Sequence, residues 1–523
     1  MRQHGRPATA AAERAPAGTG LAGTGTADTG AAGSASASTA PAGSAGQAAA
    51  FRRGGGDRPD PVPWLIALAV LAAYIPISVF PYLRDGPQSW DLGIFTEYVK
   101  QYAHLRAPVT DIRGAGVNLL GDHFHPLVAV LAPVFRLFPT PVTLLVAQAV
   151  LAAVSVVPVS RAAAATLGTG AGRAIGAAYG LSWGLQQLVN FDFHEVAFAV
   201  PLLACSLSAL ARGRVRAAAL WALPLVLVKE DQGFTVAAIG LIITLAYRRR
   251  AAGLLLAGWG ITWSVLAIWV IIPHFNARHV YPYWTAGGGI SPAGGHLTLA
   301  GLLSQLVAGA PVKLPTVALI LLPTAFLALR SPLVLAAAPG ILLRFVSTSS
   351  SYWETTWHYN ATVMPIVFIA AIDAMARIRA ARATGKPGGA AGAVERHGPA
   401  VMLAICAALA FQFPLAALWQ PQTYAISKHV AAARAAMARV PGGAAVQTDL
   451  DLLAPLGART DTFWLGNSGN PATPYVVFDT ASTDWQPPPA RVLPFVERLN
   501  HGVRYRQIYA DDGVYVFRRS GGA

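Results

Sequence analysis

The sequence predicts an α-helical polytopic membrane protein with a small α/β domain at its C-terminal end. Three observations lead to this fold class. Of the 523 residues, 54% are hydrophobic and only 12% are charged, whereas soluble domains carry about twice that share of charge. Long apolar runs alternate with short basic clusters, as in chains that cross a bilayer many times. From about residue 420 the pattern changes to short helices and strands.

The segment 1–58 is expected to be a disordered cytoplasmic tail. It consists mainly of Ala, Gly, Thr and Ser, which offer too little large apolar surface to offset the entropy lost on ordering. Arg52, Arg53 and Arg58 precede the first apolar run, and positive charge there places the N-terminus in the cytoplasm. Because basic clusters of this kind account for the net charge of +15, no nucleic-acid partner is expected.

The segment 59–419 is predicted to be a membrane domain with about eleven spans. These are 62–82, 141–160, 174–190, 196–211, 217–228, 232–247, 253–272, 311–329, 332–347, 359–376 and 400–418. Basic gaps alternate with acidic or aromatic hairpin tips along the domain. If every basic gap is cytoplasmic, every tip faces outward, so both patterns agree on one topology.

Two parts of this domain depart from simple spans. A long first external loop is expected at 83–140, and its apolar part, 126–138, is too short to span, so we interpret it as re-entrant or interfacial. The two runs around the tip 229–231 are also short for a hydrocarbon core of ~30 Å. This hairpin is expected to be shallow, with its tip in a water-filled cavity.

The segment 420–523 is predicted to be an extracytoplasmic α/β domain. A helix, a turn at 441–443, a strand and a second helix come first. The runs 474–480 and 514–519 have the apolar pattern of buried strands. An odd number of spans places this domain outside the cell.

Several motifs resemble the DUF2079 family of predicted bacterial membrane proteins. They are WDLGIF at 90–95, NLLGDHFHP at 118–126, LLVAQ at 144–148, FHE at 193–195, KED at 229–231 and HYNATVMP at 358–365. The resemblance runs from about residue 60 to the C-terminus and implies a protein of the bacterial cell membrane. The layout is also similar to that of GT-C glycosyltransferases, which use polyprenyl-phosphate sugars and carry a catalytic acidic residue in the first external loop. No D-x-D pair occurs in this loop, which disfavours a metal-bound diphosphate donor.

Asp91 is the candidate catalytic base. It lies just beyond the first apolar run, and Trp90, Ile94, Tyr98 and Tyr102 have roughly helical spacing. An amphipathic helix on the outer surface would therefore hold Asp91 at its N-terminal end. A carboxylate beside a dry cleft can deprotonate an acceptor hydroxyl. The alternative is that Asp91 only caps the helix.

Asp122, His123 and His125 form a D-H-x-H pattern, for which we expect substrate binding. Imidazole and carboxylate groups also bind metals, but spacing identifies no further ligands. We therefore assign no cofactor, and a divalent metal is the alternative. Cys205 and Cys406 lie inside apolar runs, so neither a disulfide nor metal-bound thiolates are expected.

His194, Glu195, Lys229, Glu230 and Asp231 occupy two successive hairpin tips and are candidate substrate-binding residues. Charged groups between apolar runs cost a few kcal/mol unless they are hydrated or paired. In one interpretation Lys229 simply neutralises Glu195 or Glu230. In the other, Lys229 contacts a lipid phosphate while one of these carboxylates orients the sugar or the acceptor.

Arg344 is the candidate for binding the donor's phosphate. It lies 14 residues beyond Arg330, or ~21 Å along a helix, near the outer interface. A guanidinium group binds phosphate through a bidentate fork, although snorkelling to lipid headgroups is the alternative. Trp357, His358 and Tyr359 belong either to an interfacial aromatic belt or to a surface that stacks on a sugar. The same two interpretations apply to 281–284.

These features together predict an integral membrane glycosyltransferase that passes a sugar from a polyprenyl-phosphate donor to an envelope acceptor on the outer face. Its expected partners are the lipid bilayer and that donor. A transporter or flippase for a lipid-linked or polar substrate is the alternative, and a non-catalytic membrane protein is a third. The charged residues cluster on one side of the membrane, which favours the enzyme over alternating access.

The topology makes a direct prediction for the tip around Ser350. A cysteine placed there should react with a membrane-impermeant thiol reagent added to intact cells, because the tip faces outward. Protection of this cysteine would contradict the assignment of the basic gaps to the cytoplasm.

Overall fold

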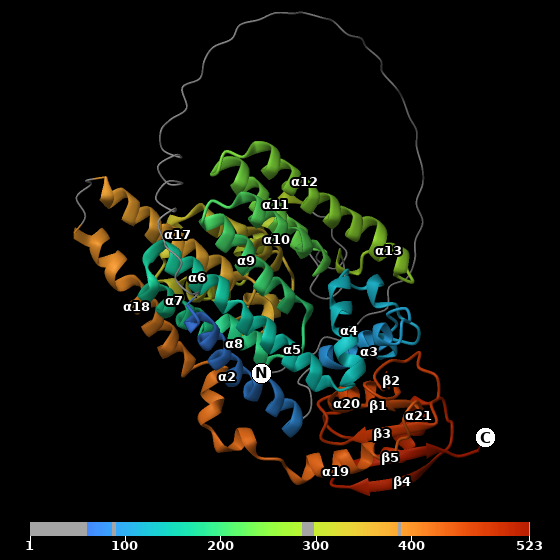
Figure 1. Ribbon diagram of the computed structural model, residues 1–523. Coiled ribbons are helices and arrows are strands. Elements are labelled where there is room, and N and C mark those ends of the chain that lie inside the picture. Colours follow the sequence, from blue (N-terminus) through green and yellow to red (C-terminus); the bar gives the residue numbers. More distant parts are fainter. Residues whose placement is uncertain (1–59, 86–89, 285–297, 385–388, 522–523) are drawn as a thin grey trace, which may run out of the picture. The chain divides into compact units, whose positions relative to one another are not determined.

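The computed structural model describes residues 60–85, 90–284, 298–384 and 389–521. Helices make up most of the described chain, and one sheet lies near its C-terminal end (Figure 1). The predicted fold class is thereby confirmed. The expected disordered tail, 1–58, lies outside the described residues.

The α-helices differ widely in length, and short 3-10 helices connect many of them. They are α2 (Val62–Asp85), α3 (Asp91–Ala103), α4 (Ala132–Leu137), α5 (Pro141–Val154), α6 (Val156–Leu167), α7 (Thr169–Gly180), α8 (Trp183–Asn190), α9 (Ala199–Ala211), α10 (Val215–Ala222), α11 (Gln232–Leu245), α12 (Arg250–Leu266), α13 (Ile272–Phe275), α14 (Leu299–Val307), α15 (Ala310–Leu321), α16 (Ala338–Phe345), α17 (Val363–Ala383), α18 (Gly389–Ala410), α19 (Lys428–Met437), α20 (Leu453–Gly457) and α21 (Val492–Leu499).

Within the described residues, five helical segments are long and apolar enough to cross a membrane. They are Val62–Arg84, Pro141–Leu167, Arg250–Phe275, His358–Ala383 and Ala391–Ala410. A sixth candidate, Leu299–Val307 with Ala310–Thr324, is bent by 71°. Other predicted spans lie on shorter apolar helices, such as Gln232–Leu245, and the predicted span 174–190 is divided between α7 and α8.

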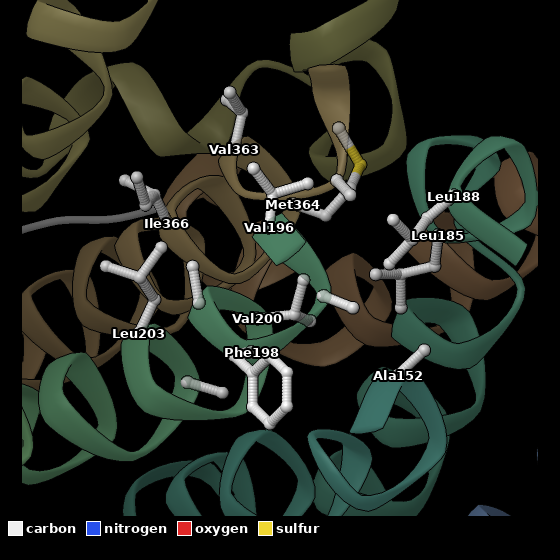
Figure 2. Packing of buried hydrophobic residues seen from close by; sticks show 14 of the residues in the cluster. Ala152, Leu185, Leu188, Val196, Phe198, Val200, Leu203, Val363, Met364 and Ile366 are labelled. Atoms are coloured by element: carbon white, nitrogen blue, oxygen red, sulfur yellow. The ribbon is translucent and has the colours of Figure 1, made fainter. Parts of the chain in front are cut away.

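Helix α17 lies in the middle of the helical core. All of its residues from Val363 to Met375 are buried, because this stretch is apolar except for Asp373, whose carboxylate pairs with Ser331 and Arg377. It packs against α6 and α9, and Figure 2 shows its side chains among those of neighbouring helices. The residues labelled in that view are Ala152, Leu185, Leu188, Val196, Phe198, Val200, Leu203, Val363, Met364 and Ile366.

Helices α11 and α12 approach each other closely through glycines. A Cβ atom on Gly233 would lie 2.3 Å from the carbonyl oxygen of Gly260, and one on Gly240 would lie 2.5 Å from that of Gly253. Small residues at such contacts are typical of helix pairs in membranes. The close pair fixes the position of the hairpin tip 229–231, which directly precedes α11.

The C-terminal sheet has five strands in the order β2-β1-β3-β5-β4. They are β1 (Ala445–Thr448), β2 (Asp461–Trp464), β3 (Tyr475–Asp479), β4 (Tyr505–Asp511) and β5 (Val514–Arg519). β1 pairs in parallel with β2 and β3, whereas β5 is antiparallel to β3 and β4. Apolar residues of α19 and α20 pack with β1, β3 and β5 in one cluster, and those of α21 belong to another. The two strands predicted at 474–480 and 514–519 are β3 and β5.

Helix α3 begins at Asp91 as predicted, but other parts of the chain enclose it. Its residues from Leu92 to Val99 are all buried, so the expectation of an exposed surface helix is wrong. The reason is Gly93, where a Cβ atom would lie 3.0 Å from that of Leu453. Because Gly93 has no side chain, α20 of the C-terminal segment packs directly against this side of α3.

Glu97 connects α3 to the C-terminal sheet. Its carboxyl group is buried and accepts hydrogen bonds from the Thr110 hydroxyl (2.8 Å) and from the backbone N–H of Thr462 on β2 (3.1 Å). Lys100, one turn further along α3, donates to the carbonyl oxygen of Thr460 (2.7 Å). Burial raises the pKa of Glu97 to about 7, although the Lys100 charge and the Thr110 bond act to lower it.

The raised pKa of Glu97 predicts a pH-dependent stability. Between about pH 4.5 and pH 7 the folded protein binds the Glu97 proton more tightly than the unfolded chain, so this group's contribution to the free energy of unfolding decreases as pH rises. The loss amounts to at most about 3 kcal/mol. We expect Glu97→Gln to flatten the pH dependence of thermal unfolding in detergent. An identical pH profile in the wild type and in Glu97→Gln would contradict the raised pKa of Glu97 as the cause of the pH dependence.

Candidate functional site

A pocket lies where the hairpin tip 229–231 meets the first loop, the loop before residue 285 and the segment from α16 to α17. It contains about 980 Å³ of unfilled space including its open mouth. The sequence-predicted residues that line it are His123, Lys229, Glu230, Asp231, Arg344, His358 and Tyr359. Residues more than 200 positions apart in the chain thus face one space.

Glu230 forms the junction of three segments in this pocket. Its carboxylate lies 2.6 Å from Nδ1 of His123 and accepts from the backbone N–H of Phe124 (3.1 Å) and the hydroxyl of Tyr281 (3.2 Å). Burial by itself would raise the pKa of Glu230, but the charge of His123 lowers it to about 2. Burial likewise disfavours the cationic form of His123, yet Glu230 raises its pKa above the usual range. The pair is therefore a buried salt bridge.

Lys229 pairs with Glu195 rather than with its neighbour Glu230. The Nζ atom of Lys229 lies 3.0 Å from Oε1 of Glu195, and Nδ1 of His194 lies 2.6 Å from Oε2 of the same carboxyl group. Although burial lowers the pKa of Lys229, the Glu195 charge raises it well above the usual value, which keeps the ammonium group charged. Lys229 thus pairs with a carboxylate, as the first interpretation expects, and it also lines the pocket, whereas its contact with a lipid phosphate stays a prediction.

Arg344 lines the pocket with one nitrogen unused. Its guanidinium donates to the carbonyl oxygens of Tyr352 (2.9 Å) and Tyr359 (3.2 Å) and to Oδ1 of Asn360 (3.0 Å), all of which are neutral acceptors. Its Nη2 atom is buried and has no hydrogen-bond partner among the described residues. A buried cation in this state favours an anionic ligand.

Two side chains beside Arg344 also have buried polar atoms without a partner in the described part of the chain. These atoms are Nε1 of Trp357 and both ring nitrogens of His358. The His358 side chain is only 2% exposed and stacks on His194, with ring centroids 3.8 Å apart. Burial of this kind is not what an interfacial belt would show for His358. Of the side chains that carry such unpartnered atoms, His358 and Arg344 line the pocket, whereas Trp357 does not.

Asp91 does not line this pocket, but its carboxyl group interacts electrostatically with His194, Glu195 and Lys229. Burial raises the pKa of Asp91, while the charges of His194, Lys229 and Arg113 act to lower it. Trp90 occupies the N-cap position of α3, so Asp91 is the first helical residue and not the cap. The Asp91 carboxyl group thus lies in the first turn of α3, near the cluster of His194, Glu195 and Lys229.

Asp122 and His125 have partners elsewhere. Asp122 forms an ion pair with Arg113 (3.0 Å) and accepts from the hydroxyl of Tyr283 (3.2 Å). His125 is buried with its Nδ1 atom 3.1 Å from the Tyr98 hydroxyl, and burial lowers its pKa to about 4. His125 is therefore neutral and does not line the pocket. In the described residues, no group of three or more His, Cys, Asp or Glu side chains has the arrangement of a metal site.

Aromatic side chains from two loops also line the pocket. Tyr281 and Tyr283 belong to 281–284, for which a sugar-stacking surface was one interpretation, and the Tyr283 ring stacks on His123 with centroids 4.3 Å apart. Tyr352 lines the pocket as well and was not predicted, although it lies in the aromatic segment that precedes Trp357. The glycines 287–289 and 294–295 of the long loop lie outside the described residues.

Comparison with known proteins agrees with this description. A family model described as "Predicted membrane protein (DUF2079)" matches residues 88–516. Two crystal structures of ArnT from Cupriavidus metallidurans, one bound to undecaprenyl phosphate and one in the apo state, each have a TM-score of 0.52. They are 13% and 14% identical to this chain, and each comparison covers 87% of this chain and 97% of ArnT. No curated protein matches the sequence. The fold is therefore GT-C-like.

The role of Glu230 as a junction can be tested by truncation. Glu230→Ala leaves the partly buried His123 without its partner, and breaking a fully buried ion pair costs roughly 3–5 kcal/mol, which is the upper limit for this pair. We expect a clear decrease in the temperature of unfolding in detergent. Asp231→Ala is the matched control, because the adjacent carboxyl group accepts a bond from its neighbour Gln232 and should cost roughly 1 kcal/mol. Equal effects of both variants would contradict the junction role.

Proposed function

The chain belongs to the DUF2079 family of predicted membrane proteins, and on that basis and its GT-C-like fold we propose that it is an integral membrane glycosyltransferase. It takes a sugar from a polyprenyl-phosphate donor and passes it to an envelope acceptor on the outer face of the bacterial cell membrane. In this proposal residues 420–523 are extracytoplasmic, and 59–419 hold the donor's lipid in the bilayer.

The unused Nη2 nitrogen of Arg344 carries this proposal. A partly buried guanidinium whose bonds go to neutral oxygens, with a buried nitrogen unpaired, favours an anion, and a lipid phosphate supplies one. The ammonium group of Lys229, which pairs with Glu195, lines the same pocket. The ArnT structure bound to undecaprenyl phosphate, similar in fold, supports a lipid phosphate as the anion.

Asp91 acts as the base in the proposed reaction. The acceptor's hydroxyl oxygen bonds to the anomeric carbon as the bond from that carbon to the phosphate oxygen breaks. The acceptor's proton passes to the Asp91 carboxylate, and polyprenyl phosphate leaves with the bonding electrons. Arg344 stabilises the negative charge that develops on the leaving phosphate. The raised pKa of Asp91 makes its carboxylate a stronger base than an exposed one.

Two substitutions test the assigned roles in the purified full-length protein. With undecaprenyl-phosphate-linked sugars and membrane-derived acceptors, Asp91→Asn should lower transfer roughly 10²–10⁴-fold and Arg344→Ala roughly 10²–10³-fold. Arg330→Ala, which truncates an exposed arginine, should transfer at the wild-type rate. Full activity of Asp91→Asn would remove this residue from the mechanism.

A deletion strain tests the activity as such. Lipid-linked sugars and envelope glycans of the strain and its parent should differ, with the donor accumulating when the gene is absent. An unchanged profile would contradict the enzyme and favour a transporter or a non-catalytic role.

A further inference from the structure

The C-terminal sheet has a topological switch point between β1 and β3. From β1 the chain runs through α20 to β2 on one side, and it then passes back to β3 on the other side of β1. In open α/β sheets, ligands bind outside the carboxyl ends of the strands at such a point. Asp449 and Asp451 follow β1, and Asp479 ends β3, so polar side chains gather at this edge.

A cleft lies at this edge, and we call it the strand-end cleft. It contains about 820 Å³ of unfilled space including its open mouth. Its charged lining residues come from α19 and the two strand ends, and they are His429, Arg434, Asp451 and Asp479. Apolar side chains of α19 and α20, such as Met437, form much of the remaining surface.

His429 is held as a cation in this cleft. Its Nε2 atom lies 2.8 Å from the Asp479 carboxylate, and its Nδ1 atom lies 2.9 Å from the carbonyl oxygen of Asp512. Both partners are acceptors, so both ring nitrogens carry a proton. Burial acts to lower the pKa of His429, but the bond to Asp479 raises it above the usual range.

The mouth of the cleft lies beside the end of a candidate membrane span. Tyr82 and Leu83, in the last turn of α2, line the cleft. The Arg434 guanidinium donates to the carbonyl oxygen of Leu83 (2.8 Å), which fixes α19 against this helix end. A ligand in the cleft would thus be bound close to the membrane surface.

We propose that the strand-end cleft binds a neutral saccharide. An anionic ligand would meet the carboxyl groups of Asp451 and Asp479, and a cationic one would meet His429 and Arg434. Hydroxyl groups suit this mixed lining, because a hydroxyl donates to a carboxyl oxygen of Asp451 or Asp479 and accepts from an N–H group of Arg434. The apolar side chains between the charges contact the C–H face of a sugar ring. The cleft shares no lining residue with the first pocket, so the proposal does not depend on the proposed reaction.

Ligand-detected NMR on the full-length protein in nanodiscs tests this site. Maltose, cellobiose, lactose and mannobiose are the probes, with inorganic phosphate and ethylamine as charged competitors. At least one disaccharide should bind, and neither ion should displace it. Asp451→Asn, an isosteric change, should weaken binding roughly tenfold or more, and Met437→Trp should abolish it by filling the cleft.

Two control variants separate this cleft from the first pocket. Arg344→Ala alters the first pocket, and Asp461→Asn alters a carboxyl group at the other end of the sheet's parallel strands, so both should bind disaccharide like the wild type. Three results would overturn the proposal. They are no binding of any disaccharide, binding unchanged in both cleft variants, and loss of binding in Arg344→Ala.

Discussion

The buried carboxylate of Glu230 is the constraint on which the arrangement of the site depends. A carboxylate in the interior of a helical membrane protein costs several kcal/mol unless charges and hydrogen bonds compensate it. Its compensation comes from His123 and Phe124 of the first loop and from Tyr281 of a later loop. Because these partners lie far from Glu230 in sequence, satisfying one buried charge gathers three segments, and the pocket is the space that remains between them.

The chemistry of the site was more predictable from sequence than its geometry. Charged residues at hairpin tips are conspicuous in an apolar chain, so the lining by Lys229, Glu230 and Arg344 could be anticipated. The sequence could not predict which carboxylate pairs with Lys229, because this depends on how the two hairpin tips that carry Glu195 and Lys229 face each other. His125 matched the D-H-x-H pattern as well as His123 did, yet it packs against Tyr98. His123 lines the pocket and His125 lies in the core, because the backbone turns between them and points the two side chains in different directions.

The fold shows the same division. Long apolar helices such as α2 and α17 are evident from composition, and strands β3 and β5 from dense apolar runs. β2 and β4 were missed because each is half polar: β4 has exposed residues along an edge of the sheet. The burial of α3 was missed because the residue responsible, Gly93, acts through what it lacks. A glycine adds nothing to an apolar pattern in the sequence, although its small size is what allows α20 to contact α3.

The bond between Glu97 and Thr462 has a consequence for biosynthesis. The two residues are 365 positions apart, so Thr462 is made long after α3 has left the ribosome. Until then Glu97 has no backbone donor from β2, and Gly93 has no α20 to pack against. The helix that begins with Asp91 therefore receives its final support only when the last part of the chain folds. A chain that stops short of the sheet would insert its helices into the membrane without completing the site.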